Sequence, residues 1–462
     1  MLGRVGGGRA DARTLGAFSL AVALPSSSQT VLIPVIPALA DEQGWSEASS
    51  TWLVSSFLVV ASISAPLMGR IGDMAGRRRL IIATGLMYLC GSALCLAGSS
   101  SLSVLVVGRM LQGSAAGIFV LQIATIQELS GYARRGLSIG LLSGVVGIGP
   151  AVGFLVGGAL SEWFGVDSVF VAGIVLSIAS TVLLWLWTPR SGGMATGGID
   201  VAGAGLLASW FTLVLLWLST AGDYGWLSLW SASLAGGAVL LIVSWLAVQL
   251  TRAYPLIDLR MMRTPAVGWG TAATVANGCA IFSLFLAVPQ LVQAESGVHS
   301  GPGFNLGPVG TGLVLAPGAV TLVVAGLISG WLGSRLGPRV PAVIGSLIST
   351  VGLGSLATFH SSLVGIIAWV IVISVGFGMT FPALPVLVMN AVDRSHVGAA
   401  AGLNSLARGF GSAVGAQAAP VLISLGTDEI PRYGYAFAAG AVFSLLTAVL
   451  LVSYVAVVEG AN

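Results

Sequence analysis

Long runs of apolar residues, separated by short polar segments, repeat along the whole chain. A membrane-spanning helix needs about 20 mostly apolar residues. The polar segments, such as DEQGWSEASS at 41–50, carry the glycine and charged residues that are typical of loops. The pattern predicts an all-α integral membrane protein with fourteen transmembrane helices. They are expected near 15–39, 51–70, 80–98, 102–127, 136–160, 166–187, 201–221, 229–250, 266–291, 309–333, 340–358, 363–389, 397–424 and 433–457.

The arginines predict the orientation of these helices across the membrane, because cytoplasmic loops carry an excess of positive residues. If the N-terminus lies in the cytoplasm and the chain crosses fourteen times, 16 arginines fall inside and only Arg432 falls outside. Without one of the spans at 201–221 and 229–250, six arginines would move outside. We therefore expect an even number of crossings, both termini in the cytoplasm, and a place in the inner (plasma) membrane.

Composition agrees with a surface covered by lipid. Apolar residues make up 56% of the chain and charged residues 8%, with a mean hydropathy of +0.98; a soluble domain carries roughly 25% charged residues. The 65 glycines favour close packing of helices in lipid. The chain has no GxxxxGK[ST] loop and no metal-ligand spacing among its cysteines and histidines. We expect no enzymatic activity, cofactor, metal site or nucleic-acid partner.

Two segments of the first half return in the second half. GLLSGVVGIGPAVG at 140–153 matches GLNSLARGFGSAVG at 402–415 with eight identities in fourteen, at an offset of 262. GRIGDMAGRR at 69–78 matches GWLGSRLGPR at 330–339 at an offset of 261. The repeat predicts a six-helix bundle at 14–187, an inserted helix pair at 201–250 and a second six-helix bundle at 266–457. Paired halves with a substrate between them are a recurrent plan of transporters.

The segment GRIGDMAGRRR at 69–79 joins the second and third predicted spans. Its glycines allow a tight turn between two helix ends, and its acid can form an ion pair with neighbouring arginines. A charged loop that only fixes topology is the alternative. The spacing resembles the G-x-L-a-D-r-x-G-r-k signature of the major facilitator superfamily. The resemblance implies a cytoplasmic gate at Gly69, Asp73, Gly76 and Arg77, with Glu128 as a second acid.

The fourth predicted span contains a charged residue, Arg109, with Gln112 and Gly113 on the same helical face at i+3 and i+4. An arginine inside a span costs about 2.5–3.5 kcal/mol on insertion scales, so it needs a partner or a water-filled cavity. A side chain that snorkels to the outer surface is the alternative. The pattern resembles the R-x-x-q-G motif of the same superfamily, which implies a role in proton transfer or substrate contact.

In the fifth predicted span, Gly149 and Gly153 lie four residues apart, and Pro150 removes a backbone hydrogen bond and bends the helix. Generic packing of small residues is one explanation. The G-P-x-x-G core also resembles the antiporter motif of exporters in the superfamily. The resemblance implies that Gly149, Pro150 and Gly153 belong to an export machinery.

These motifs, with PLIDLRMMRTP at 255–265 and VGAAAGLNSLARGFGSAVG at 397–415, make the chain similar to the fourteen-helix drug:proton antiporter family along essentially its whole length. That family carries an acid in its first helix, whereas the aligned residue here is Ser28. All 16 acids of the chain lie in loops or at helix ends. If transport is coupled to protons, the titrating acid is therefore expected to be peripheral: Asp73, Glu128 or Glu295.

Polar residues that are expected to line the cavity include Asn277, Asn404 and Arg408, although each is individually more typical of a hydrogen bond between helices. A cavity with Arg109 and Arg408 but no carboxylate is poorly suited to a lipophilic cation, because like charges repel in a low dielectric. We therefore expect a neutral or anionic substrate.

The sequence predicts a secondary active exporter of an antibiotic or related amphiphilic molecule, working as a monomer by alternating access, with protons and the lipid bilayer as its other partners. An importer or facilitator of a small metabolite with the same fold is the main alternative. The missing first-helix acid favours it, and the Gly149-Pro150 helix opposes it. A sensor that does not transport is a third interpretation.

Overall fold

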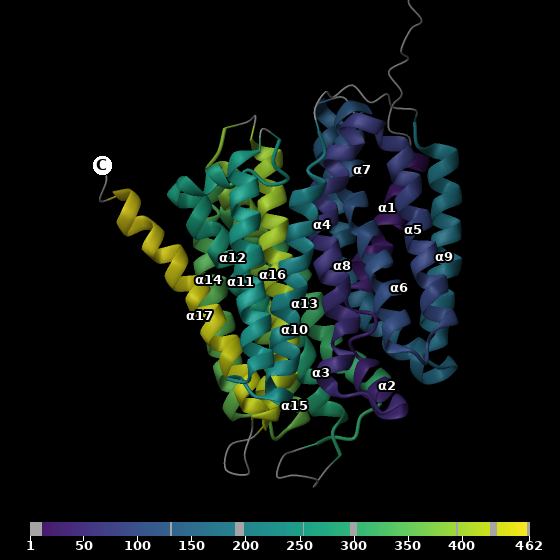
Figure 1. Ribbon diagram of the computed structural model, residues 1–462, viewed down its shortest axis with the longest axis vertical. Helices are drawn as coiled ribbons and strands as arrows, with labels where there is room; N and C mark the ends of the chain where they lie inside the picture. The colour runs from purple at the N-terminus through teal and green to yellow at the C-terminus, as the bar shows by residue number, and fades with distance from the viewer. Residues whose placement is uncertain are drawn as a thin grey trace, which may run out of the picture.

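The computed structural model describes residues 12–129, 132–189, 198–252, 254–295, 303–393, 396–425 and 432–459. Long helices run side by side through the molecule and are joined by short turns at their two ends (Figure 1). The end that holds Ala12 and Glu459 is here called the termini end. The opposite end, which holds the short helices α2 and α3, is called the distal end (Figure 1).

The first crossing is a broken one. Helix α1 (Ala12–Ser28) has 17 residues, and turns at 29–35 lead into α2 (Ile36–Gln43). Pro34 and Pro37 explain the break, because a proline lacks a backbone donor and disfavours the helical conformation of the residue before it. At the distal end lies α3 (Glu47–Ser50). Ser46, the residue before it, caps the helix because its side chain accepts a hydrogen bond from the Ser49 backbone N–H.

The remaining helices of the first half pack with α1 into what we call the first helix group. Gly76 lies in the turn between two of them with a φ of +93°, which glycine adopts without a steric penalty. The members are α4 (Trp52–Ala75), α5 (Arg77–Ala97), α6 (Leu102–Ser114), the 3₁₀ turn η1 (Ala115–Gly117), α7 (Ile118–Leu129), α8 (Tyr132–Phe164) and α9 (Asp167–Trp187).

A hairpin of α10 (Val201–Tyr224) and α11 (Leu229–Thr251) follows, and the 3₁₀ turn η2 (Leu259–Arg263) leads onward. One buried carboxylate organises its termini end. Asp200 Oδ1 accepts a hydrogen bond from Gly203 N at 2.8 Å, and Oδ2 accepts from Gln249 Nε2 at 2.7 Å and Leu256 N at 3.2 Å. Asp200 thereby joins the start of α10, the end of α11 and the segment that leaves the hairpin.

The second half of the chain forms a second helix group, in which α12 packs mainly against α16 and α17, and α15 packs against α13 and α14. Direct contact with the first group runs through α16 on α4 and α13 on α8, while α10 lies across α4 and α16. The members are α12 (Pro265–Gln293), α13 (Pro308–Leu336), α14 (Arg339–Thr358), α15 (Leu363–Asn390), α16 (Val397–Ser424) and α17 (Arg432–Glu459).

Twelve helices in the described ranges are long and apolar enough to cross a membrane, two fewer than the fourteen that the sequence predicts. The twelve coincide with twelve of the expected stretches. The two that differ are 15–39, which the break after Ser28 divides, and 397–424. The latter is one helix of 28 residues, α16, but it carries Asn404, Arg408 and Gln417 among small residues, which lowers its hydropathy.

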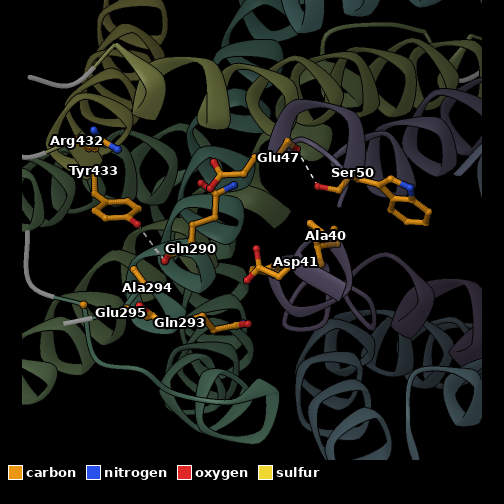
Figure 2. Close-up of a pocket in the computed structure, with 14 residues that line it drawn as sticks. Ala40, Asp41, Glu47, Ser50, Gln290, Gln293, Ala294, Glu295, Arg432 and Tyr433 are labelled. Atoms are coloured by element: carbon orange, nitrogen blue, oxygen red, sulfur yellow. Dashed lines mark hydrogen bonds between the residues drawn. The ribbon is translucent and has the colours of Figure 1, made fainter. Parts of the chain in front are cut away.

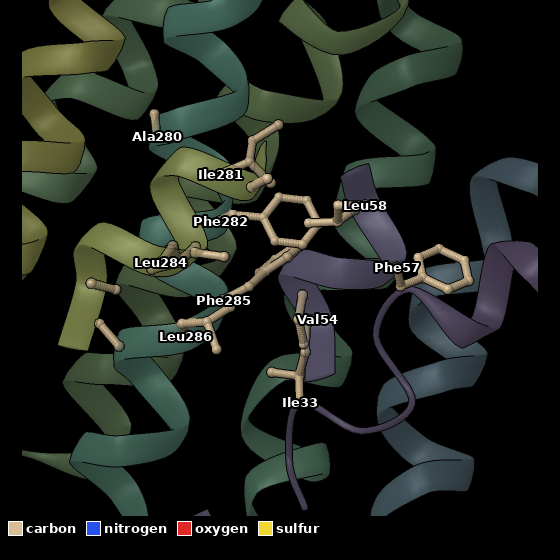
Figure 3. Packing of buried hydrophobic residues seen from close by; sticks show 14 of the residues in the cluster. Ile33, Val54, Phe57, Leu58, Ala280, Ile281, Phe282, Leu284, Phe285 and Leu286 are labelled. Atoms are coloured by element: carbon tan, nitrogen blue, oxygen red, sulfur yellow. The ribbon is translucent and has the colours of Figure 1, made fainter. Parts of the chain in front are cut away.

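The two helix groups share one hydrophobic core. Its first-group residues all lie in the distal half, whereas its second-group residues, such as Val267 and Leu403, extend to the termini end. Phe282 and Phe285 of α12 point toward Val54 and Leu58 of α4 (Figure 3), and the ring of Phe154 from α8 lies 5.0 Å from that of Phe285.

In the termini half each group also has a core of its own. One contains only first-group residues, such as Phe18 and Ile81, and another only second-group residues, such as Ala342 and Leu384. Apolar packing between the two groups is therefore concentrated in the distal half of the first group.

Candidate transport site

Arg109 of α6 is 1% exposed and lies between α1 and α4. Its Nε donates to Leu53 O at 2.8 Å, Nη1 donates to Ser28 Oγ and to Gln112 Oε1, both at 2.7 Å, and Nη2 donates to Ser28 O at 2.7 Å. The guanidinium carbon also lies 4.6 Å from the centre of the Phe57 ring. The side chain therefore turns into the first group and does not snorkel to the surface.

In this network, neutral oxygen atoms stabilise the buried positive charge of Arg109. Four hydrogen bonds and an aromatic face replace the water that the guanidinium loses, which is what a buried charge requires. Gln112 completes the network, since its Nε2 donates to Ser92 Oγ at 2.9 Å. Ser28 is thus the partner of Arg109 in space. It is the residue that aligns with the first-helix acid of the fourteen-helix drug:proton antiporter family.

The second group supplies a different set of polar residues. Asn404 Nδ2 donates to Thr274 Oγ1 of α12 at 2.8 Å. Asn277, also on α12, is 2% exposed, and its Oδ1 has no hydrogen-bond partner among the described residues. The guanidinium carbon of Arg408 lies 5.0 Å from the centre of the Phe381 ring of α15. Within the described ranges, no hydrogen bond or carboxylate accompanies that contact.

The structure therefore does not bring all the predicted cavity residues together. Arg109 and Gln112 belong to one network in the first group, where Gly113 packs against the Phe57 backbone, and Asn277, Asn404 and Arg408 lie in the second. The two groups are linked instead by Gln417, whose Oε1 accepts from Ser55 Oγ at 3.0 Å and whose Nε2 donates to Ala48 O at 3.0 Å. Gln293 Nε2 adds a bond to Pro34 O at 2.8 Å.

The glycines of α8 allow it to approach α1 closely. A Cβ at Gly149 would overlap Ser26, and one at Gly153 would overlap Ser27 and Thr30. The Pro150 carbonyl oxygen accepts a hydrogen bond from Thr30 Oγ1 at 2.9 Å. Close packing between helices is what the geometry of this stripe provides.

The predicted gate lies at the termini end, where α4 turns into α5. Gly69 faces Val120 of α7, and Arg77 Nη1 donates to Ala124 O at 3.2 Å, so this turn is attached to α7. The side chains of Asp73 and Glu128 lie outside what the structure describes.

A cavity of about 590 Å³ opens at the distal end, between α2 and α3 on one side and α12 and α17 on the other. Figure 2 shows Asp41 and Glu47 on the wall formed by α2 and α3, facing Gln290, Glu295, Arg432 and Tyr433 on the other. We call this the distal pocket. The sequence indicated Glu295 only as a peripheral acid and did not place Asp41 or Glu47 in a site. The one available signal was that all these residues fall on the same predicted side of the membrane.

Comparison with known proteins identifies the chain. The family model described as Major Facilitator Superfamily matches residues 18–416 and 270–461. The cephamycin export protein CmcT of Amycolatopsis lactamdurans is 29% identical, over 91% of this chain and 88% of that protein. The tetracenomycin C resistance and export protein of Streptomyces glaucescens is 25% identical, over 90% and 77%.

A solved structure agrees on the fold. The human organic anion transporter MFSD10 (TETRAN) superposes with a TM-score of 0.60 at 16% identity, covering 95% of this chain and 99% of that one. The chain therefore belongs to the major facilitator superfamily and is a multi-pass membrane transporter rather than an enzyme.

Proposed function

We propose that this protein is a secondary active exporter of an antibiotic or another amphiphilic small molecule, working by alternating access and proton antiport. The names of its relatives support export: one exports cephamycin, and one confers resistance to tetracenomycin C and exports it. The G-P-x-x-G core of α8 supports the same direction. The protein acts as a monomer in the plasma membrane.

The observation that carries the proposal is the way in which the two helix groups meet. Their joint core takes its first-group residues from the distal half alone, and each group has a further core of its own in the termini half. A transporter that works by alternating access needs two bodies that are fastened at one end and can separate at the other. This arrangement favours a state that loads substrate from the termini end.

The arginine pattern supports a cytoplasmic termini end, so loading there corresponds to export. The proposed topology has fourteen crossings, with the broken α1–α2 segment and α16 added to the twelve apolar helices. Residues 14–187 and 266–457 then form two six-helix bundles, and the α10–α11 hairpin is an inserted pair beside them.

Within this scheme Arg408 is the proposed contact for substrate, supported by Asn404 and Asn277. Its guanidinium has an aromatic neighbour but no carboxylate in the described ranges, so an anionic or neutral polar group can interact with it favourably. Arg109 and Gln112 form a fixed polar element that holds α1, α4 and α6 together, and Gly113 is proposed to let α6 approach α4 closely beside it. A neutral or anionic substrate is therefore favoured over a lipophilic cation.

Gly69, Asp73, Gly76, Arg77 and Glu128 form the proposed cytoplasmic gate. Gly149, Pro150 and Gly153 give the helix contact that moves with the cycle. Because the first helix offers Ser28 in place of an acid, the proton carrier is proposed among the peripheral carboxylates.

An importer or facilitator of a small metabolite is the second candidate, and the contact of Ser28 with Arg109 is the observation that favours it. Among the described residues, the buried arginine contacts Ser28 and no acid, so uncoupled or differently coupled transport needs no change in that network.

Everted membrane vesicles from an efflux-deficient host test the proposal. With an acidic lumen, vesicles that contain the protein should accumulate a neutral or acidic antibiotic, and dissipation of the pH gradient should abolish the uptake. Arg408→Ala should reduce uptake of the acidic compound more than that of the neutral one. Equal uptake of ethidium and the acidic compound would contradict the substrate preference, and uptake that ignores the gradient would contradict proton antiport.

A further inference from the structure

The distal pocket carries a net negative charge, whereas the buried charged residues discussed above, Arg109 and Arg408, are cations. Its lining contains three carboxylates, Asp41, Glu47 and Glu295, and one guanidinium, Arg432. Their formal charges sum to −2, in a cavity between α2 and α3 on one side and α12 and α17 on the other. Such a cavity attracts cations, whereas Arg109 and Arg408 in the two groups repel them.

A second observation points to a ligand with hydrogen-bond donors. Gln290 is 6% exposed, lines the pocket, and extends its amide toward Glu47 across the gap (Figure 2). Its Oε1 has no hydrogen-bond partner within the described ranges. An orphaned buried acceptor is costly, and an N–H donor in the pocket would satisfy it.

Size and geometry favour an organic cation over a metal ion. The volume of about 590 Å³ lies within the range of cavities that hold small molecules. Within the described ranges, no group of three or more histidine, cysteine, aspartate or glutamate side chains is placed to hold a metal ion. The Trp45 and Tyr433 side chains supply aromatic surface at the wall, and an aromatic face stabilises an ammonium group.

We propose that the distal pocket binds a small amphiphilic molecule through its ammonium group, which lies between Asp41 and Glu47 and donates to Gln290. Arg432 lies on the opposite wall and its charge acts on Glu47 across the pocket, and the three carboxylates outnumber it, so the lining as a whole keeps an excess of negative charge. The site is separate from the region of Arg408, and the inference goes beyond the proposed function. It depends neither on the direction of transport nor on the coupling ion.

The test is a binding measurement on the purified full-length protein in lipid nanodiscs. The probe is dansylcadaverine, a fluorescent primary amine, and the comparison compound is its N-acetylated form, which has the same fluorophore and no charge. Fluorescence anisotropy at neutral pH should show at least about fivefold tighter binding of the amine. Glu47→Gln should weaken it about threefold, and Asp41→Asn with Glu47→Gln about tenfold, since each removes one opposite charge.

Glu42→Gln is the matched control, because Glu42 is the exposed neighbour of Asp41 and does not line the pocket. This variant should bind the amine as the unmodified protein does. Thermal unfolding of each variant in the same nanodiscs checks that the fold is retained.

Equal affinity for the amine and its acetylated form would overturn the inference. So would an amine affinity that stays within a factor of two in the double variant. Because the assay involves no transport, either failure would leave the export proposal standing, and a failed vesicle experiment would leave this site standing.

Discussion

The hydroxyl of Ser28 lies 2.7 Å from Nη1 of Arg109, and the carbonyl oxygen of Ser28 lies 2.7 Å from Nη2. A single residue of α1 therefore occupies both terminal nitrogens of a buried guanidinium. The drug:proton antiporter family carries an acid at this sequence position. Here the position holds Ser28, which binds Arg109 through neutral oxygens.

Replacing Ser28 with aspartate should change the charge preference of transport. The new carboxylate would neutralise Arg109 at hydrogen-bond distance, and a buried cation would no longer repel a lipophilic cation in the first group. We expect S28D to raise ethidium export severalfold relative to that of an acidic compound, measured in resistance assays and in vesicles. Ser28→Asn, which has the same shape without the charge, should leave the ratio unchanged. Equal ratios in both variants would contradict this assignment.

Arg109→Lys should be strongly destabilising even though it keeps the charge. An ammonium cannot reach Leu53 O, Ser28 and Gln112 from one nitrogen as the forked guanidinium does. The loss of two or more charged hydrogen bonds in a buried site costs about 3 kcal/mol, and transport should fall with it. Thermal unfolding in detergent measures the effect. Arg335→Lys, at an exposed residue that stacks on Trp331, should change stability by less than about 1 kcal/mol.

The α1–α8 contact can be tested with one methyl group. Gly153→Ala places a Cβ against Ser27 and Thr30 and should destabilise the protein by about 1–3 kcal/mol. Gly147→Ala, on the same helix, meets nothing within 4 Å and should be neutral or slightly stabilising, because alanine favours a helix. Similar melting temperatures for both variants would show that the contact is looser than the structure indicates.

Removing the Asp200 carboxylate should loosen the α10–α11 hairpin. Asp200→Ala leaves Gln249 Nε2 and two backbone donors without their acceptor, at an expected cost of about 2 kcal/mol. Asp258→Ala is the comparison, since Asp258 caps the short η2 turn at an exposed site, and should cost less than about 1 kcal/mol. Limited proteolysis between α11 and η2 reports the loosening; equal cleavage of both variants would refute it.

His360 makes the stability of the second group dependent on pH. Burial lowers the pKa of its imidazole below the ordinary value, although hydrogen bonds to the Leu356 and Ala357 backbone oppose the shift. The unfolded chain then binds more protons than the folded one, so stability is complete at neutral pH. It should decline as the pH falls below about 6.5. Unfolding at pH 7.5 and 5.5 measures this, and His360→Gln should reduce the difference.

Much of the fold could be predicted from the sequence, because a bilayer requires long apolar helices and twelve expected stretches coincide with helices of that kind. Run length alone could not reveal the break after Ser28, which depends on how Pro34 and Pro37 interrupt an apolar run. Mean hydropathy likewise leaves α16 out of the twelve apolar helices, because its polar residues lower the average although they face other helices.

The candidate site was only partly predictable. The i, i+3 spacing of Arg109 and Gln112 places them together, because a helix brings such residues onto one face. The distal pocket could not be anticipated in this way. Asp41, Glu47, Glu295 and Arg432 come from three separate segments, and only the packing of α2 and α3 against α12 and α17 brings them to one cavity.

The joint core of the distal half also sets a condition on the working cycle. To admit water at that end, the protein has to expose the rings of Phe154, Phe282 and Phe285, which lie in contact across the interface. In the proposed cycle, the free energy lost there has to be offset by apolar contacts that the two helix groups form elsewhere. Substitutions that enlarge the apolar contact around Phe154, Phe282 and Phe285 should slow transport by holding the molecule in one state.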